Sequence, residues 1–270
     1  RIMIELRGNA LRKKTINEKV EFKKEYPLVK FNFILNEKND ESVSYVKMLE
    51  KFVVALGIDY KIISISSVEE GIRYVESCKD DRNNMVIVAR PLGFDNEEKI
   101  IERISPLQDP DMLTKENIGD LVFGDLNKLT GTAKSVISLL NNYEIDVKGK
   151  KALIIGRSIS VGMPIFLALQ RMGAFCSLAH SKVSVADIKN ASLESDIIVL
   201  ASGQRNLIGS KDISKKAIVI DCGYHSDGKG DIDFVPDCEY FTPVPGGVGP
   251  MTIASVIKSG YYLRTLKNDN

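Results

Sequence analysis

The residues best placed to do chemistry form a short turn bounded by glycines, Gly156-Arg157-Ser158 through Val161-Gly162-x-Pro164. The turn follows an apolar run, Lys151–Ile155, that predicts a buried strand, and it precedes a run that predicts a helix. Glycines here let the backbone approach a pyrophosphate, and the helix that follows points its free N–H groups at the charge. Because the middle glycine of G-x-G-x-x-G is absent, the turn alone also fits an α/β connection that binds nothing.

Polar residues end the next predicted strand, Phe175–Ala179, with the sequence His180-Ser181-Lys182. Sites that prefer NAD usually carry Asp or Glu there to bind the ribose 2′-hydroxyl, whereas NADP sites use basic and hydroxyl groups. Arg157 can reach the same place, and charge-assisted hydrogen bonds to a 2′-phosphate are strong. Taken singly, His180 and Lys182 fit an exposed polar loop. Together with Arg157 they predict NADP as the cofactor rather than NAD.

Alternating strand-like and helix-like segments must position these residues. The strands predicted for the first half are Val29–Leu35, Tyr60–Ile65 and Met85–Ala89, with helices at Asp40–Leu56 and Val68–Ser77. The strands predicted for the second half are Lys151–Ile155, Phe175–Ala179, Asp196–Ala201 and Ala217–Asp221, after a mostly helical stretch at 117–147. Strands separated by helices at this spacing predict βαβ units and parallel sheets. The predicted fold class is therefore α/β, in two domains.

Length and composition fit a two-domain enzyme and argue against several other classes. The chain has 270 residues, of which 44% are hydrophobic and 27% charged, and its net charge is +1. A nucleic-acid binder usually shows a clear basic excess, and a bilayer span needs roughly 20 apolar residues. Four dispersed cysteines with two histidines argue against a metal site and favour a reducing compartment. We expect a cytoplasmic protein with no metal, membrane or nucleic-acid partner.

A run rich in proline and glycine, Pro243–Thr252, is the most distinctive part of the chain. With the Gly156 turn, His180-Ser181, Asp221-x-Gly223 and Gly230-Asp231-x-Asp233-Phe234, it closely resembles the methylenetetrahydrofolate dehydrogenase/cyclohydrolase family. The resemblance covers nearly the whole chain, and it is strongest from Asp146 to the end. It implies a homodimer, with a folate-binding domain, a Rossmann NADP domain and a cleft between them.

The resemblance also implies domain limits and two reactions. The folate domain takes 1–116 plus 253–270 and the NADP domain 117–252, since the amphipathic segment Ile253–Leu266 is expected to fold back onto the first domain. A hydride passes from the one-carbon bridge of 5,10-methylenetetrahydrofolate to NADP. Water then opens the methenyl cation to 10-formyltetrahydrofolate. The implied substrate is thus a tetrahydrofolate derivative.

Site residues are implied by their places in the family's motifs. Tyr45 and Asp111 are the implied catalytic and substrate-binding residues, with Asp111 bonding the pterin ring, and Pro245, Gly246 and Gly247 are further implied substrate contacts. The implied cofactor-binding residues are Gly156, Arg157, Ser158, Val161, Gly162, Pro164, His180, Ser181, Gly203, Gly223 and Thr252.

Three of the family's folate motifs are altered in this sequence. The family carries a lysine four residues after the tyrosine on one helix, but here Tyr45 is followed by Leu49. Four residues advance about 400° on a helix, so that lysine would share the face of Tyr45, whereas Lys47 and Lys51 lie on other faces. The family's Gln is replaced by Ala89, and its Pro-Cys-Thr-Pro segment is replaced by Thr130–Ala133.

These departures affect the two reactions unequally. Hydride transfer is driven by a nitrogen lone pair and mainly requires positioning. Hydrolysis needs activated water, to which a positioned acid–base group contributes ~10²–10⁴-fold. The sequence predicts a dehydrogenase with weak or lost cyclohydrolase activity. Two alternatives stay open: a bifunctional enzyme in which Lys51, Arg90 or a loop residue replaces the missing groups, and a non-catalytic NADP- or folate-binding paralogue.

Overall fold

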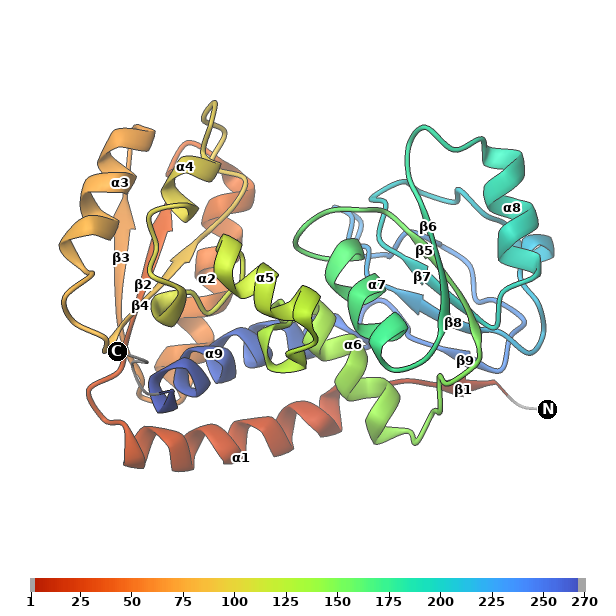
Figure 1. Ribbon diagram of the computed structural model, residues 1–270, viewed down its shortest axis with the longest axis horizontal. Helices are drawn as coiled ribbons and strands as arrows, with labels where there is room; N and C mark the ends of the chain where they lie inside the picture. The colour runs from red at the N-terminus through yellow and green to blue at the C-terminus, as the bar shows by residue number, and fades with distance from the viewer. Residues whose placement is uncertain (1–2, 267–270) are drawn as a thin grey trace. The chain divides into compact units, whose positions relative to one another are not determined.

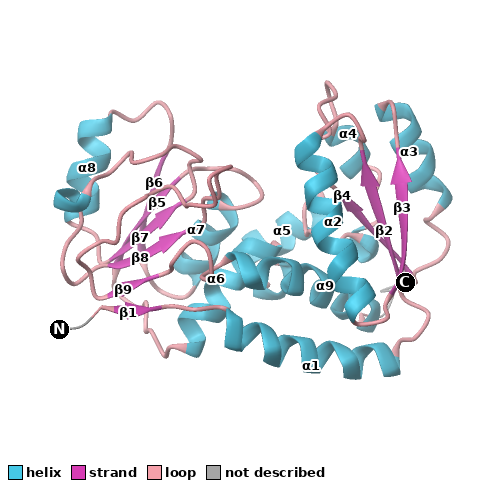
Figure 2. Ribbon diagram, turned by 180° about the vertical axis from the view of Figure 1, so that it is seen from behind, coloured by secondary structure: helices cyan, strands magenta, loops and turns pink. Residues whose placement is uncertain are grey.

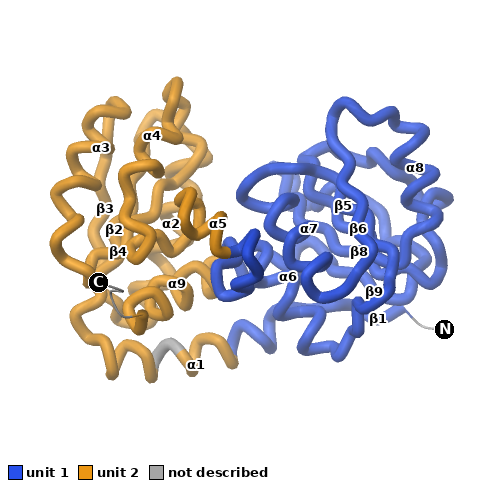
Figure 3. Tube along the Cα trace, viewed as in Figure 1, with its two compact units in different colours: residues 1–13, 121–252 blue, residues 14–120, 253–270 orange. Residues whose placement is uncertain are grey.

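In a computed structural model, which describes residues 3–266 apart from the side chains of 19 and 20, the chain divides into two compact units (Figure 3). Unit 1 comprises the segment up to Lys13 together with Leu121–Thr252. Unit 2 comprises Lys14–Asp120 together with the segment from Ile253 onward. The borders fall inside three helices, α1 (Asn9–Glu25), α5 (Lys115–Phe123) and α9 (Gly249–Thr265).

Unit 1 is built on a six-stranded sheet whose neighbouring strands are all parallel (Figures 1 and 2). Its order is β1 (Ile4–Glu5), β9 (Tyr240–Phe241), β8 (Ile218–Asp221), β7 (Ile197–Leu200), β5 (Lys151–Ile155) and β6 (Phe175–Ala179). The chain leaves β5 for the edge strand β6 on one side and then crosses to β7 on the other side of β5. That reversal is a topological switch point, where ligands of open α/β sheets bind at the carboxyl ends of the strands.

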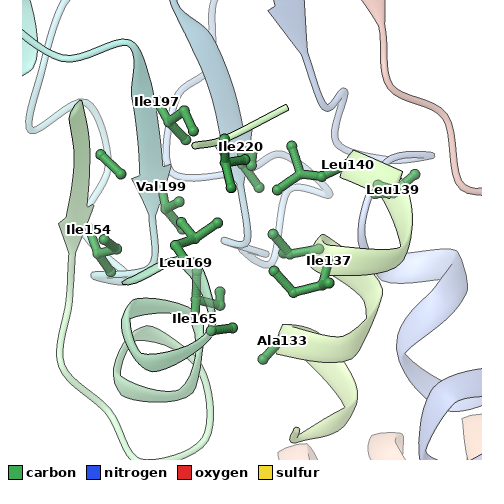
Figure 4. Packing of buried hydrophobic residues seen from close by; sticks show 14 of the residues in the cluster. Ala133, Ile137, Leu139, Leu140, Ile154, Ile165, Leu169, Ile197, Val199 and Ile220 are labelled. Carbon is green, nitrogen blue, oxygen red and sulfur yellow. The ribbon is translucent and has the colours of Figure 1, made fainter. Parts of the chain in front are cut away.

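Helices cover both faces of this sheet. On one face, α6 (Gly131–Asn142) and α7 (Gly162–Arg171) pack against Ile154, Val199 and Ile220 of three adjacent strands (Figure 4). On the other face, α8 (Val185–Leu193) contributes Ile188 to a second cluster with the alternate strand residues. Strands buried on both faces explain the short, continuous apolar runs that the sequence shows.

Unit 2 has a three-stranded parallel sheet in the order β3 (Asp59–Ser64), β2 (Lys30–Leu35) and β4 (Asn84–Val88). One face packs against α2 (Asp40–Ala55) and α9, which supply Phe52 and Tyr261 to a cluster with Phe31 and Phe33. The opposite face packs against α3 (Val68–Ser77) and α4 (Glu98–Ile101). The part of α9 from Ile253 onward therefore contributes to the core of this unit.

The α/β fold class and its parallel sheets are confirmed, but the predicted place of the first residues is wrong. Residues up to Lys13 group with unit 1, because β1 pairs in parallel with β9 through Ile4 and Tyr240. Two-residue strands are too short to show alternation, so the sequence predicted neither β1 nor β9. Within residues 3–266, the structure has no helix that combines the length and the apolar character needed to cross a membrane.

Candidate functional site

A pocket of about 290 Å³ lies in unit 1 at the carboxyl ends of β5, β6 and β7. Each strand passes directly into a loop that lines it. The lining includes Gly156, Arg157, Ser158, His180, Ser181 and Ser202. Five of these six residues are those that the sequence predicted to bind a cofactor, and the sheet brings them together at its topological switch point.

The glycine turn before α7 admits no side chain at either end. Gly156 has a φ of +122°, and a Cβ there would collide with the carbonyl oxygen of Ala201. A Cβ on Gly162, the first residue of α7, would collide with the carbonyl of Gly156. Within the turn, the N–H of Val161 donates to Oγ of Ser158 at 3.2 Å. The turn is therefore closed tightly enough for a phosphate to approach the start of the helix.

The polar groups around this pocket suit an anion. Arg157 is exposed, and among the described residues no carboxylate lies within ion-pair distance of its guanidinium. The backbone N–H of Lys182 donates to Nδ1 of His180 at 3.2 Å, which shapes the loop after β6, and Ser181 is exposed beside it. A free guanidinium and a free hydroxyl in one pocket can hold a phosphate by charge-assisted hydrogen bonds.

A buried carboxylate holds the loop after β7. Oδ2 of Asp231 accepts the backbone N–H groups of Ser202 and Gly203, both at 3.0 Å. Its Oδ1 lies 3.0 Å from Nε2 of His225. From the sequence, Asp231 was recognisable only as part of a motif, and His225 was not predicted. A buried acid in a glycine-rich segment was the available signal, because such a group must be hydrogen-bonded.

Asp221, at the end of β8, organises the next loop in the same way. Its carboxylate accepts the N–H groups of Gly223 at 2.8 Å, Asp231 at 3.0 Å and Ile232 at 3.1 Å. Burial raises the pKa of Asp221, and these backbone hydrogen bonds oppose that rise. Gly203 and Gly223, both predicted to bind the cofactor, thus lie in loops that two buried aspartates hold.

The run rich in proline and glycine follows a compact backbone path in unit 1. Gly246 has a φ of +112°, and its carbonyl accepts the N–H of Gly8 at 3.0 Å. The N–H of Gly247 donates to the carbonyl of Pro243 at 2.7 Å, and a Cβ on Gly247 would lie 2.7 Å from that same oxygen. The glycines are therefore required by close backbone approach. Pro245 lies within this run, and Thr252 lies in the first turns of α9.

The other predicted residues, Tyr45 and Asp111, belong to unit 2, where Arg90 joins them. Tyr45 is on α2, Arg90 follows β4, and Asp111 follows a 3₁₀ turn at Pro106–Gln108. All three are half-buried, and none of their side chains has a hydrogen-bond partner among the residues that the structure describes. Three polar side chains without protein partners are available to bind a ligand.

Charge couples these three groups. Burial, followed by the charge of Asp109, raises the pKa of Asp111 to about 7, and Arg90 opposes the rise. Burial, followed by Asp111, raises the pKa of the Tyr45 phenol well above its usual value, and Arg90 again opposes the rise. Tyr45 therefore stays a neutral hydrogen-bonding group at physiological pH. Asp111, in contrast, changes charge close to neutrality.

The positions of the family's missing lysine and glutamine are occupied by core residues. Leu49 and Ala89 are both 0% exposed and lie in the apolar cluster against which Tyr45 packs. Lys51 is exposed on α2, and about 3.6 residues per helical turn place it away from the face shared by Tyr45 and Leu49. No basic nitrogen from Lys51 therefore takes the place of the missing lysine.

The strand order, the switch-point pocket and the glycine turn define unit 1 as a dinucleotide-binding domain of the dehydrogenase type. Residues 130–267 match the family model of the tetrahydrofolate dehydrogenase/cyclohydrolase NAD(P)-binding domain. The bifunctional protein FolD of Clostridium beijerinckii is 36% identical over 230 residues, which cover 81% of this chain and 80% of that protein.

Two solved structures extend the similarity over almost the whole chain. The bifunctional FolD of Campylobacter jejuni is 31% identical, with a TM-score of 0.89 over 97% of this chain and 98% of that one. The FolD of Trypanosoma brucei, complexed with NADP and an inhibitor, is 26% identical, with a TM-score of 0.88 over 97% of each chain.

The chain belongs to the tetrahydrofolate dehydrogenase/cyclohydrolase family. The predictions of this family and of a dehydrogenase are thereby confirmed. The matched domain and the NADP complex of the trypanosomal relative also support the predicted cofactor. The individual site residues and the state of the cyclohydrolase stay predictions.

Proposed function

We propose that this chain oxidises 5,10-methylenetetrahydrofolate to 5,10-methenyltetrahydrofolate with NADP, and that it hydrolyses the methenyl product weakly or not at all. In this proposal unit 1 binds the dinucleotide and unit 2 binds the folate. The relatives named above are described as bifunctional dehydrogenase/cyclohydrolases, so the second half of the proposal separates this chain from them.

The dinucleotide pocket supports NADP in particular. Bound there, NADP supplies the hydride acceptor. The turn at Gly156 and the first turn of α7 present backbone N–H groups to the pyrophosphate. Arg157 and Ser181 are free to bind a 2′-phosphate, and none of the residues His180-Ser181-Lys182 is an acid that would repel it. The Asp231 carboxylate holds Ser202 and Gly203 in place, so the pocket wall is formed before the cofactor arrives.

The folate residues support hydride transfer without a catalytic base. A nitrogen lone pair of the substrate drives the hydride off its neighbouring carbon, so the protein has to bind and orient the folate. Asp111 accepts hydrogen bonds from the pterin ring, and its negative charge offsets the positive charge that develops on the one-carbon bridge. Neutral Tyr45 packs against the folate and offers its hydroxyl as a donor.

One observation carries the proposed loss of the cyclohydrolase: Leu49 and Ala89 place aliphatic side chains, fully buried, where the family has its lysine and glutamine. Hydrolysis needs a group that takes a proton from water near neutral pH. Arg90 does not serve, because an arginine guanidinium keeps its proton in proteins. Water in this site therefore lacks the positioned base that the family's motif supplies.

A second candidate function, the full bifunctional activity, is favoured by Asp111. A carboxyl group whose pKa is raised to about 7 has the proton affinity of an effective general base. The bifunctional activity competes with the first proposal only if Asp111 can contact water while the folate is bound. The predicted homodimer and cytoplasmic location stay predictions from the sequence.

Two absorbance measurements on the purified protein separate these proposals. Formation of NADPH from methylenetetrahydrofolate measures the dehydrogenase, and decay of added methenyltetrahydrofolate measures the cyclohydrolase. We expect steady NADPH formation, accumulation of methenyl product and decay near the rate without enzyme. Fast decay that Asp111→Asn abolishes would favour the bifunctional reading. Absence of NADPH formation with either NADP or NAD would reject the dehydrogenase.

A further inference from the structure

Arg90, the half-buried arginine that joins Tyr45 and Asp111 in unit 2, has no role in the mechanism proposed above. Arg90 follows β4 directly after Ala89, on the same edge of the sheet as the start of α2. The amide of Asn36, which follows β2, donates to the carbonyl of Leu92 at 2.7 Å. This bond ties the loop after β2 to the loop that carries Arg90, so the arginine backbone is anchored beside the helix of Tyr45.

The loop is also closed on its far side. The carboxylate of Glu97 accepts the N–H groups of Leu92 at 2.7 Å and Gly93 at 3.2 Å. The N–H of Arg90 donates to the carbonyl of Val88 at 2.9 Å. The backbone of Arg90 is thus held on both sides, and Val88, two residues before it, lines the same small cavity as Asp111. The guanidinium makes no ion pair or hydrogen bond with any residue that the structure describes, and its charge acts on the Asp111 carboxyl.

A guanidinium beside an unpaired carboxylate matches one edge of a pterin. That edge presents an amino group and a ring N–H, which donate, and then a carbonyl oxygen, which accepts. A carboxylate supplies acceptors only, and a guanidinium supplies donors only. Asp111 alone therefore accepts hydrogen bonds from two of the three groups and leaves the carbonyl oxygen without a donor. An unpaired acceptor in a buried site costs binding free energy.

We propose that Arg90 is a specificity-determining residue of the folate site, whose guanidinium donates to the pterin carbonyl while Asp111 accepts from the adjacent N–H and amino groups. The inference rests on the proposed function, because it assumes that the pterin binds beside Asp111. In this inference Arg90 binds the substrate and takes no part in proton transfer. The residue directly after the lost glutamine thus selects the substrate.

The test compares Arg90→Ala and Arg90→Lys with the control Arg103→Ala, which removes an exposed arginine of the same unit. Arg90→Ala should raise KM for methylenetetrahydrofolate roughly 10- to 100-fold and leave KM for NADP unchanged, as expected for a lost hydrogen bond to a charged donor. The pH at which kcat/KM is half-maximal should move upward, since Asp111 loses its neighbouring cation. Arg90→Lys should restore that pH while recovering only part of the affinity.

A substrate analogue adds a readout that folding does not affect. In a 4-amino pterin, a donor replaces the carbonyl acceptor that faces the guanidinium, and the adjacent ring nitrogen loses the hydrogen that Asp111 accepts. The wild type should therefore prefer the 4-oxo form of the same reduced pterin, and Arg90→Ala should reduce that preference about tenfold while leaving the part that depends on Asp111. An unchanged preference, or kinetics identical to those of Arg103→Ala, would overturn the inference.

Failure of the proposed function is distinguishable from failure of this inference. If the wild type forms no NADPH, the dehydrogenase is rejected, and calorimetry with tetrahydrofolate itself still compares the wild type with Arg90→Ala. Weaker binding by the variant then supports the role of Arg90. Equal affinities, or no binding to the wild type, overturn it.

Discussion

The candidate dinucleotide site depends mainly on backbone groups, whereas the candidate folate site depends on side chains. In unit 1 the pocket depends on backbone: Gly156 and Gly162 leave room for one chain path, and two buried aspartates hold the neighbouring loops through N–H groups. In unit 2 the proposed folate chemistry depends on single side chains on α2 and in two loops. A backbone site tolerates few changes, whereas a side-chain site loses one activity through one or two substitutions and keeps its fold. This contrast explains how one family fold can carry one reaction or two.

Truncation after Thr252 should separate the two units most sharply. It removes Ile257 and Tyr261 from the core of unit 2, and each large buried side chain contributes about 1.5–3 kcal/mol. The described core of unit 1 takes no residue from beyond Thr252. By hydrogen exchange, we expect β2 and β4 to lose protection while β5 and β7 keep it. A soluble truncated protein with unchanged exchange in β2 would show that α9 is dispensable.

If the cyclohydrolase is weak or lost as proposed, Leu49→Lys with Ala89→Gln should raise methenyl hydrolysis. A lysine beside a cationic substrate in a dry site has its pKa lowered, so it can act as a base near neutral pH. Methenyl decay should rise on the order of 10²-fold while NADPH formation stays within a few-fold. Both positions are 0% exposed, so the thermal midpoint should fall.

The matched control for this variant is Leu49→Met with Ala89→Gln, which keeps the side-chain length and lacks the base. Only the lysine variant should accelerate methenyl decay. Two results would contradict the idea. One is a wild-type hydrolysis rate comparable to its dehydrogenase rate, and the other is a lysine variant that binds folate normally yet gains no hydrolysis.

Gly162→Ala tests whether the backbone of the glycine turn binds the dinucleotide. The added Cβ collides with the carbonyl of Gly156, so the turn has to open and its N–H groups leave the pyrophosphate. Affinity for NADP should fall on the order of 100-fold, measured by calorimetry, with folate affinity unchanged. Gly119→Ala is the matched control, because a Cβ there meets no atom within 4 Å. Equal affinities in the two variants would show that the turn does not bind the phosphates.

The same contrast explains what the sequence could predict. The strands β5 and β6 match their predicted limits, because each is a short, mostly apolar segment: β5 ends at Gly156, and β6 ends at the polar residues His180-Ser181. The pocket residues followed from the carboxyl ends of those strands. The role of Asp231 came only from the structure, since the N–H groups that it holds belong to Ser202 and Gly203, 28–29 residues away in sequence. The effect of Arg90 on Asp111, 21 residues away, likewise needed the structure. Local patterns do not reveal such pairs.

Arg157→Ala tests the choice of cofactor. Loss of a charge-assisted contact to the 2′-phosphate should weaken NADP by about 1.5–3 kcal/mol, which is roughly 10- to 150-fold. NAD, which lacks that phosphate, should bind almost as before. The ratio of the two dissociation constants is the measurement. Equal losses for both cofactors would mean that Arg157 contacts another part of the dinucleotide.

The pH profile of the dehydrogenase should report Asp111. Because the pKa of Asp111 is raised to about 7, its carboxylate is mostly protonated at pH 6 and mostly ionised at pH 8. Only the ionised form accepts pterin N–H groups and offsets the developing positive charge. We therefore expect kcat/KM for the folate to rise about tenfold over that range. Asp111→Asn should have a lower kcat/KM and a nearly flat profile.

Stability should change in the opposite direction with pH. A carboxyl whose pKa is raised on folding binds its proton more tightly in the native state, so its contribution to stability is complete below its usual value of 3.8 and declines as the pH rises through about 7. The difference in unfolding free energy between the wild type and Asp111→Asn should therefore move against the wild type between pH 4 and 8. A difference that stays constant, with a pH-rate profile unchanged in the variant, would place the titration that controls activity on another group.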